Sequence, residues 1–167
     1  MKELSLVIFK PDVFEADGLK NRVEERFYEE ITRAGLSVIE KGEKIQFTPK
    51  LCEEHYGHVK KYNNGQWIFD ITQEFMLSGK SQPLIIAGEN AIMTVRKIIG
   101  PTIYAKEGLR ATSESSTQNS ARNYVHASGL AKEGDPYREA KEEIARFFPK
   151  SVKKLQSNPD FAGFWGK

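Results

Sequence analysis

One histidine in this chain stands in surroundings that suit nucleophilic chemistry. His126 follows the apolar residue Val125 and precedes two small residues, Ala127 and Ser128, before a turn at Gly129. Small neighbours leave room for a bulky group on a ring nitrogen. Histidine is mostly neutral near pH 7, so one nitrogen keeps a lone pair that can attack phosphorus without a separate base. We interpret His126 as a candidate acceptor of a phosphoryl group; the alternative is a packed or surface strand histidine.

A lysine at the end of the first apolar segment could steady the charge of such a phosphate. Lys10 is followed by Pro11 and Asp12, and the rigid proline fixes where the lysine stands. A compact ammonium is a good point charge for a phosphate oxygen. The alternative for Lys10 is a solvated strand terminus. Asp12 either orients Lys10 or caps the following turn.

Three further residues could complete this chemistry. A nucleophilic histidine needs a carboxylate or carbonyl on its other nitrogen, and Glu143 in the last predicted helix can supply one. Arg96 and Arg110 are candidates for spreading the charge that develops on a transferred phosphate, and loss of one such donor typically costs roughly 10²–10³ in rate. The alternative for all three is an ordinary exposed side chain.

Other signals in the sequence are weaker. Gly79-Lys80-Ser81 resembles the end of a phosphate-binding loop, but Glu74 stands where that motif requires glycine. His55 and His58 are three residues apart on a predicted helix and could chelate a metal. No third ligand is evident in the sequence, so we interpret both as surface histidines and predict no protein-held metal.

Bulk properties limit the class of protein. The chain has 167 residues, of which 39% are hydrophobic and 29% charged, as in one soluble globular domain spanning residues 1–167. Its 25 basic and 23 acidic residues are interspersed, so we expect no nucleic-acid partner. Cys52 is the only cysteine and no apolar stretch is long enough for a membrane span. We therefore expect a cytoplasmic protein without membrane contact.

Apolar periodicity predicts the elements that must position these residues. The strands are expected at residues 4–9, 36–47 (bent near Gly42), 83–87 and 124–126. The helices are expected at 19–35, 49–60, 66–77 and 90–99, with a last one after Asp135-Pro136. This order predicts an α+β sandwich, a small sheet covered by helices. Residues 101–121 are predicted to form a long functional loop, and the last residues, 149–167, an irregular arm.

In the order and spacing of its motifs, the chain resembles nucleoside diphosphate kinases from about Leu4 to Phe148. The resemblance rests on several runs rather than on one match: Lys10-Pro11-Asp12, Glu54-His55-Tyr56, Arg96 to Thr102, Gly108-Leu109-Arg110 and Asn123 to Ser128. It implies a ferredoxin-like βαββαβ core, with a small antiparallel sheet covered by helices.

The resemblance also implies roles for individual residues. His126 would be the phosphorylated nucleophile, with Tyr56 beside it and Ser128 and Glu143 orienting its ring. The residues implied to hold the nucleotide are Lys10, Arg96, Thr102, Arg110 and Asn123. The family stacks the base on an aromatic ring, and the extra residues around 60–70 leave either Trp67 or Phe69 for this role.

The activity implied is a ping-pong exchange of the γ-phosphate between nucleoside tri- and diphosphates such as ATP and GDP. Mg²⁺ would arrive on the nucleotide phosphates, and the chain would form a homo-oligomer. Residues 101–121 depart from the family's usual runs, and an insertion follows Gly129. Two alternatives remain: a family-like nucleotide-binding or partner-binding module with weak or no kinase activity, and a signalling protein that passes phosphate from histidine to other proteins.

Overall fold

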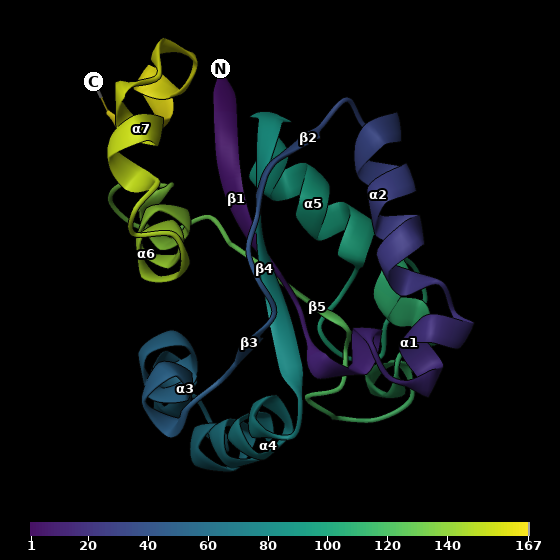
Figure 1. Ribbon diagram of the computed structural model, residues 1–167. Helices are drawn as coiled ribbons and strands as arrows, with labels where there is room; N and C mark the ends of the chain where they lie inside the picture. Colours follow the sequence, from purple (N-terminus) through teal and green to yellow (C-terminus); the bar gives the residue numbers. More distant parts are fainter. Residues whose placement is uncertain (167) are drawn as a thin grey trace.

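The centre of the molecule is one antiparallel sheet in the order β2-β4-β1-β5, with the short β3 paired to β4 (Figure 1). The computed structural model describes residues 1–166. The strands are β1 (Lys2–Phe9), β2 (Ser37–Lys41), β3 (Ile45–Gln46), β4 (Lys80–Glu89) and β5 (Val125–Ala127). With the helices between them they form the βαββαβ order of a ferredoxin-like fold. The predicted α+β fold class is confirmed.

One face of the sheet is covered by α2 (Val23–Arg33) and α5 (Ala91–Ile99), which lie side by side (Figure 1). Their apolar side chains recur at helical spacing, so each helix turns one stripe toward the strands. The fully buried members of this layer include Val7, Phe9, Val23, Phe27, Leu84, Ile86, Ala91 and Val95.

The opposite face is covered by helices from three parts of the chain (Figure 1). They are α3 (Pro49–Tyr56), α4 (Gly65–Leu77), α6 (Arg138–Phe147) and the C-terminal segment. Their buried residues form a second core layer that includes Leu4, Leu6, Ile8, Cys52, Met76, Ala140, Ile144 and Phe164. Strand β1 contributes alternate residues to both layers, as a central strand must.

The helix predicted over residues 19–35 is in fact two helices. The chain forms α1 (Ala16–Lys20), breaks at residues 21–22, and resumes as α2. Arg22 has a left-handed backbone, with φ of 52°, which no continuous helix accommodates. Leu19 is 65% exposed, so its place in the apolar stripe was a coincidence of spacing.

The bent strand predicted at 36–47 is two strands, β2 and β3, which both pair with β4. The chain leaves the ladder around Gly42, where a Cβ atom would lie 2.9 Å from the ring of Pro83. The helix predicted at 49–60 also divides, since α3 tightens into the 3-10 helix η2 (Gly57–Lys61). Helices α3 and α4 thus lie between β3 and β4 in the chain and pack on the second face of the sheet.

The C-terminal arm is helical rather than irregular, which corrects our expectation. It consists of α7 (Val152–Ser157), the 3-10 turn η5 (Pro159–Phe161) and α8 (Ala162–Trp165). Leu155, Phe161 and Phe164 are buried in the second core layer, and Lys2 pairs with Asp160 at 2.7 Å. These apolar residues come at spacings of six and three, which gave no clear helical period.

Residues 101–121 form the expected loop, with two 3-10 turns, η3 (Leu109–Thr112) and η4 (Glu114–Ser116). Its backbone is tied together internally, because Tyr104 donates to the carbonyl of Ser115 and Ser115 donates to that of Arg122. Within residues 1–166, no helix has both the length and the apolar character needed to cross a bilayer.

Candidate active site

The pairing of β1 with β5 brings the lysine and the histidine together. Ile8 lies directly opposite His126 in the antiparallel register, and the backbone N–H of Lys10 donates to the carbonyl of Tyr124 at 2.8 Å. Because side chains alternate along a strand, Lys10 shares the face of Ile8 and is the diagonal neighbour of His126. Residues that are more than a hundred positions apart therefore meet under α3 and α6.

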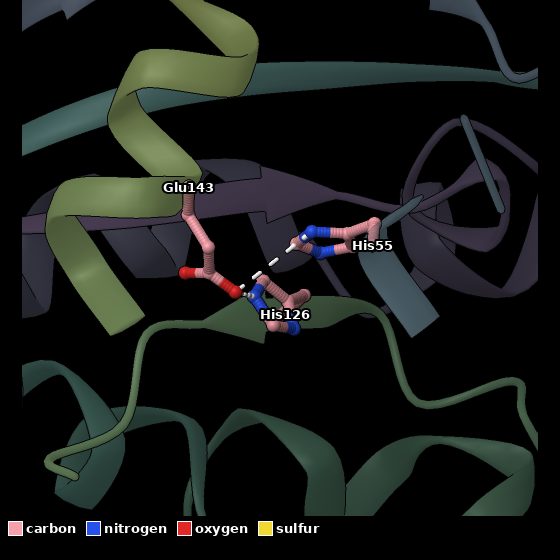
Figure 2. Close-up of side chains that lie close together, drawn as sticks. All are labelled: His55, His126 and Glu143. Carbon is pink, nitrogen blue, oxygen red and sulfur yellow. Dashed lines mark hydrogen bonds and ion pairs between the residues drawn. The ribbon is translucent and has the colours of Figure 1, made fainter. Parts of the chain in front are cut away.

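The imidazole of His126 is held by a carboxylate on one nitrogen only (Figure 2). Glu143 Oε1 lies 2.8 Å from Nε2, and the other oxygen of Glu143 accepts from the hydroxyl of Ser128. Ser128 in turn accepts from the backbone N–H of Leu6 at 3.0 Å. With Glu143 ionised, its carboxylate can only accept, so this bond assigns the ring proton to Nε2 and leaves the lone pair on Nδ1.

The long segment between β5 and α6 does not prevent this contact. The backbone N–H of Ala131 donates to the carbonyl of Pro136, which closes the inserted loop on itself. Glu139 in the first turn of α6 accepts from the backbone N–H of Gly129 at 3.0 Å. These two bonds fix the start of α6, and Glu143 follows one turn later with its side chain 6% exposed.

Burial keeps the His126 ring neutral. It lowers the pKa of His126 to about 3, and the nearby charges of Lys10 and Arg110 act in the same direction. Burial also raises the pKa of Glu143. A neutral ring with a free Nδ1 at neutral pH is the form that can act as a nucleophile.

Lys10 is a buried cation with two hydrogen bonds. Its Nζ donates to the carbonyl of Ala121 and to Oδ1 of Asn123, both at 2.8 Å. Burial lowers the pKa of Lys10 to about 7, against the attraction of Asp12. An ammonium this poorly solvated gains more than a surface lysine would from an incoming anion.

Arg110 is also buried, and one of its N–H donors has no hydrogen-bond partner. It bonds the carbonyls of Gly100 and Val125, while its Nε has no partner. The hydroxyl of Tyr56 is likewise buried without a partner. Burial lowers the pKa of Arg110 to about 10 and raises that of Tyr56. Buried unpaired donors are rare in folded proteins, so this pair marks a place prepared for an anion.

Arg96 and Thr102 approach the site from α5 and the loop that follows it. Both side chains are exposed, and the charge of Arg96 acts on both Arg110 and His126. Asn123 connects this side to Lys10, because its amide donates to the carbonyl of Thr102 at 3.0 Å. Hydrogen bonds and nearby charges therefore connect the predicted phosphate and sugar ligands to the surroundings of His126.

Asp12 attracts the charge of Lys10 and has a further role that the sequence did not show. Its Oδ2 accepts from the backbone N–H of Tyr124 at 3.0 Å. Tyr124 has φ of 66°, a left-handed conformation that costs a bulky residue free energy. Asp12 and the preceding turn therefore stabilise the backbone kink that leads into the His126 strand.

His55 is the residue whose position we predicted wrongly. It is 2% exposed rather than a surface histidine, and its ring centroid lies 4.4 Å from that of His126. Burial lowers the pKa of His55 well below its ordinary value. His58 is exposed as predicted. The position of His55 next to Tyr56 was the only signal in the sequence that could have placed His55 in the site.

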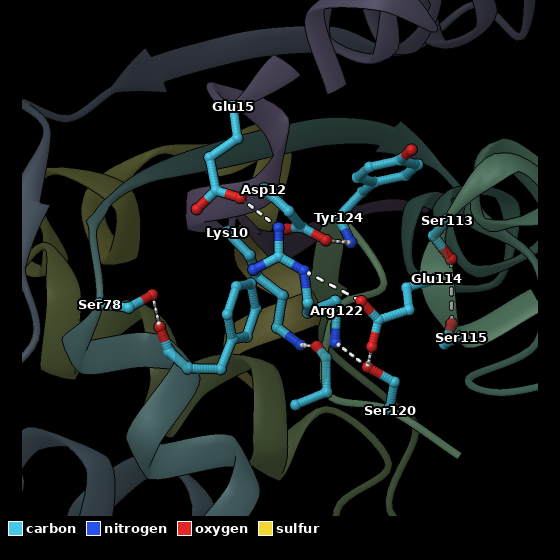
Figure 3. A network of polar contacts seen from close by, with 12 residues as sticks. Lys10, Asp12, Glu15, Ser78, Ser113, Glu114, Ser115, Ser120, Arg122 and Tyr124 are labelled. Atoms are coloured by element: carbon cyan, nitrogen blue, oxygen red, sulfur yellow. Dashed lines mark hydrogen bonds and ion pairs between the residues drawn. The ribbon is translucent and has the colours of Figure 1, made fainter. Parts of the chain in front are cut away.

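A charged network that the sequence analysis did not find closes one side of the site (Figure 3). Arg122 forms a close ion pair with Glu15 and lies 3.4 Å from Glu114. Its guanidinium also stands over the ring of Phe75, 5.1 Å from the centroid. Glu114 accepts from Ser120 at 2.7 Å. Arg122 thus connects the loop of residues 101–121, called the polar loop below, to the turn after β1 and to α4.

The two candidate stacking residues differ in access. Phe69 is 4% exposed and packs within the core layer, whereas Trp67 is 49% exposed. Trp67 also lines a cavity of about 390 Å³ between α4 and the polar loop, together with Phe75 and Arg122. The cavity opens beside the Lys10 region because Phe75 contacts both the Lys10 and Arg122 cations.

Comparison with known proteins identifies the family of the chain. The family model for nucleoside diphosphate kinase matches residues 3–153. A nucleoside diphosphate kinase of Methanobrevibacter smithii is 31% identical over 149 residues, covering 89% of this chain and 88% of that protein.

Two solved structures have the same fold. The nucleoside diphosphate kinase of Encephalitozoon cuniculi aligns with a TM-score of 0.68 at 22% identity, covering 98% of both chains. That of Halobacterium salinarum, in complex with CDP, aligns with a TM-score of 0.64 at 22% identity and covers 89% of this chain and 88% of its own. Together, the family model over residues 3–153 and the archaeal relative show that this chain belongs to the nucleoside diphosphate kinase family.

Proposed function

We propose that this protein moves the γ-phosphate from a nucleoside triphosphate to a nucleoside diphosphate in two steps through a phosphohistidine at His126. The observation that carries the proposal is the one-sided hydrogen bonding of the ring. Glu143 binds Nε2 at 2.8 Å, which leaves the ring lone pair on Nδ1, and the charges of Lys10 and Arg110 act on the same ring.

The proposed step balances on these atoms. The Nδ1 lone pair forms the N–P bond while the bond from the γ-phosphorus to the bridging oxygen breaks, and the nucleoside diphosphate leaves with that electron pair. The ring becomes cationic with its proton kept on Nε2. Glu143 stabilises this charge, as the aspartate of a Ser-His-Asp triad stabilises the imidazolium of its histidine. The second nucleotide reverses the step.

The cations would supply the electrostatic part of catalysis. Lys10 and the free Nε of Arg110 are buried donors whose positions are fixed by hydrogen bonds to backbone carbonyls. Donors that need no reorganisation stabilise the charge on the transferred oxygens. The Tyr56 hydroxyl would add a further donor. Arg96, Thr102 and Asn123 would hold the remaining phosphates and the sugar, as the family resemblance implies.

Mg²⁺ fits this site as part of the substrate. The two buried carboxylates nearest the cations, Asp12 and Glu143, are already bonded to Tyr124, Ser128 and His126. Mg²⁺ usually keeps several waters and is bound through substrate phosphates. When bound there, it would neutralise phosphate charge, while the residues described above orient the nucleotide.

One structural relative and one cavity support the nucleotide class that we propose. The Halobacterium relative binds CDP. We propose the same class here, nucleoside tri- and diphosphates such as ATP and GDP, with the base resting on Trp67 at the mouth of the 390 Å³ cavity. From the family resemblance we also propose a homo-oligomer. The single buried cysteine, Cys52, is compatible with a reducing cytoplasmic location.

Labelling with ATP that is radioactive at the γ-phosphate tests the proposal. We expect acid-labile label on the protein that transfers completely to added GDP. His126→Ala removes the nucleophile, so it should lose all labelling. His58→Ala is the matched control, because His58 is an exposed histidine outside the ring pair, and it should label as the native protein does.

Each other outcome contradicts the proposal in a different way. Label that remains on the protein when GDP is added would indicate a signalling protein. A folded native protein that takes up no label would indicate a nucleotide-binding module. Label that survives in a folded His126→Ala variant would mean that another residue is the nucleophile.

A further inference from the structure

The proposed nucleophile and two neighbouring side chains form a group that could also bind a metal ion. His55, His126 and Glu143 each place one potential metal-ligand atom within 4.8 Å of the others. Glu143 Oε1 is 2.8 Å from His126 Nε2 and 3.8 Å from His55 Nδ1. Figure 2 shows the two rings next to each other on one side of the carboxylate, with dashed lines from Glu143 to both. The rings come from α3 and β5, and Glu143 comes from α6. The three ligands are thus held by separate elements of the core.

The types of donor favour a transition metal over magnesium. Two imidazoles and one carboxylate form a ligand set that Zn²⁺ accepts, with a water as fourth ligand. Metal–ligand bonds of about 2.0–2.2 Å in a tetrahedron place neighbouring ligand atoms about 3.3 Å apart. The separations of 2.8 Å and 3.8 Å lie on either side of that value. All three ligand atoms lie within 4.8 Å of one another, so we expect side-chain rotations to bring them to one ion.

A cavity gives access from solvent. It has a volume of about 530 Å³ and is lined by both His55 and Glu143. Its other lining residues include His58, Glu139, Glu142 and Arg146. The cavity provides a path for a small hydrated ion and space for the water that would complete the coordination.

One residue opposes metal binding in the present arrangement. Arg146 lies 3.1 Å from His55 Nδ1, and a guanidinium group can only donate. His55 Nδ1 therefore carries a lone pair that Arg146 occupies, and the other nitrogen, Nε2, is buried without a partner. Arg146 is half-buried and lines the cavity, so it can move aside when a metal takes its place.

We propose that His55, His126 and Glu143 form a binding site for a divalent transition metal such as Zn²⁺, and that the bound metal inhibits phosphoryl transfer. The inhibition, though not the binding, rests on the function proposed above.

Inhibition follows from the position of the ring proton. A metal on Nε2 needs the lone pair of that nitrogen, so the proton that Nε2 shares with Glu143 must leave it. If the ring stays neutral, the proton moves to Nδ1, and Nδ1 no longer has a lone pair with which to attack phosphorus. The metal also takes Glu143 away from the cation that the reaction would form.

The position of the ring proton also predicts that phosphorylation weakens metal binding. Once Nδ1 carries a phosphoryl group, the cationic ring holds its proton on Nε2 against Glu143. A metal must then displace a proton from a ring that Glu143 stabilises as a cation. Phosphoenzyme should therefore bind the metal more weakly than free enzyme.

Binding can be measured without reference to activity by titrating the full chain with Co²⁺. Visible absorption bands of tetrahedral Co²⁺, saturating at one ion per chain and displaced by Zn²⁺, are the expected result. His55→Gln should weaken binding by more than the roughly 10–100-fold that the loss of an outer partner costs a metal site. Glu89→Gln is the control, because Glu89 is a 69% exposed carboxylate outside this cavity, and it should leave the titration unchanged.

Arg146→Gln is a second variant that keeps all three ligands. It removes the competing donor and a positive charge, so we expect tighter Co²⁺ binding and inhibition by Zn²⁺ at lower concentration than in the native protein. This variant keeps the proposal testable if His55→Gln does not fold, which circular dichroism would show.

Three results would overturn the proposal: no Co²⁺ bands in the native protein, bands that persist in folded His55→Gln, or bands lost in Glu89→Gln. Weaker binding in Arg146→Gln would also contradict it. Failure of the proposed function gives a different pattern, in which Co²⁺ binds as expected but ATP leaves no label on His126. Binding of Co²⁺ without any effect of Zn²⁺ on transfer, at a fixed excess of Mg²⁺-nucleotide, would refute the inhibition alone.

Discussion

At the scale of single residues, the site combines one neutral nucleophile with buried cations, and removing these cations from water costs free energy. Residue type alone was enough to choose His126, Lys10 and Glu143 from the sequence, because few residue types can attack phosphorus or stabilise the charge of a phosphate. The sequence could not show that His55 is buried, since two histidines three apart on a helix are equally compatible with the surface. Nor could it show the Arg122 network, which depends on contacts with distant segments.

Lys10 gives the residue scale a test by pH. Burial lowers its pKa in the folded protein to about 7 from an ordinary value of 10.5. Between these values the unfolded chain binds more protons than the folded one, so the free energy of unfolding should rise with pH across this window. Lys10→Met removes the titration, and that rise should disappear in urea unfolding measured from pH 7 to 10.

Lys50→Met is the matched control, because the side chain of Lys50 is 87% exposed, and it should keep the pH dependence of the native protein. Lys10→Met should also lower kcat/KM by roughly 10²–10³, as expected for loss of a preorganised donor. An unchanged slope in Lys10→Met would mean that this lysine is not the buried cation described here.

At the scale of elements, the sequence indicated most helices and strands but not their breaks. The apolar stripes of α2 and α5 and the run of β1 were readable because burial imposes a period on them. The break at Arg22 and the helical arm after Phe148 were not, because a left-handed residue and widely spaced apolar contacts leave no period. The polar loop of residues 101–121 was correctly predicted, but not the backbone bonds that hold it.

The start of η3 gives a test at this scale. Gly108 has φ of 72° and lies so close to the end of α5 that a Cβ atom would be 2.7 Å from the N of Gly100 and 2.8 Å from the O of Ile98. Gly134 has φ of 75° with nothing within 4 Å of that position. Both Gly→Ala changes incur the left-handed penalty of about 1–2 kcal/mol, but only Gly108→Ala adds a backbone clash.

We therefore expect Gly108→Ala to lower the free energy of unfolding by clearly more than Gly134→Ala does, in urea denaturation. Because Arg110 follows Gly108 by two residues, Gly108→Ala should also reduce kcat, whereas Gly134→Ala should not. Equal losses of stability in the two variants would contradict the close packing of this loop on α5.

At the scale of the whole molecule, the fold brings to one point residues that are far apart in the chain. Lys10 directly follows β1, Tyr56 ends α3, Arg110 lies in the polar loop, His126 in β5 and Glu143 in α6. The sequence predicted this convergence only through resemblance to a family, since no local pattern encodes contacts between strands or across layers. The register of β1 with β5 is what makes the convergence specific.

The most direct test of the central claim is to determine which nitrogen of which histidine carries the phosphoryl group. Phosphoenzyme prepared with ATP from protein containing nitrogen-15 histidine can be examined by phosphorus and nitrogen NMR. We predict a single phosphohistidine at Nδ1 of His126, with the Nε2 proton retained against Glu143 and the phosphorus signal lost when GDP is added. A phosphoryl group on Nε2, or on any residue other than His126, would contradict the account.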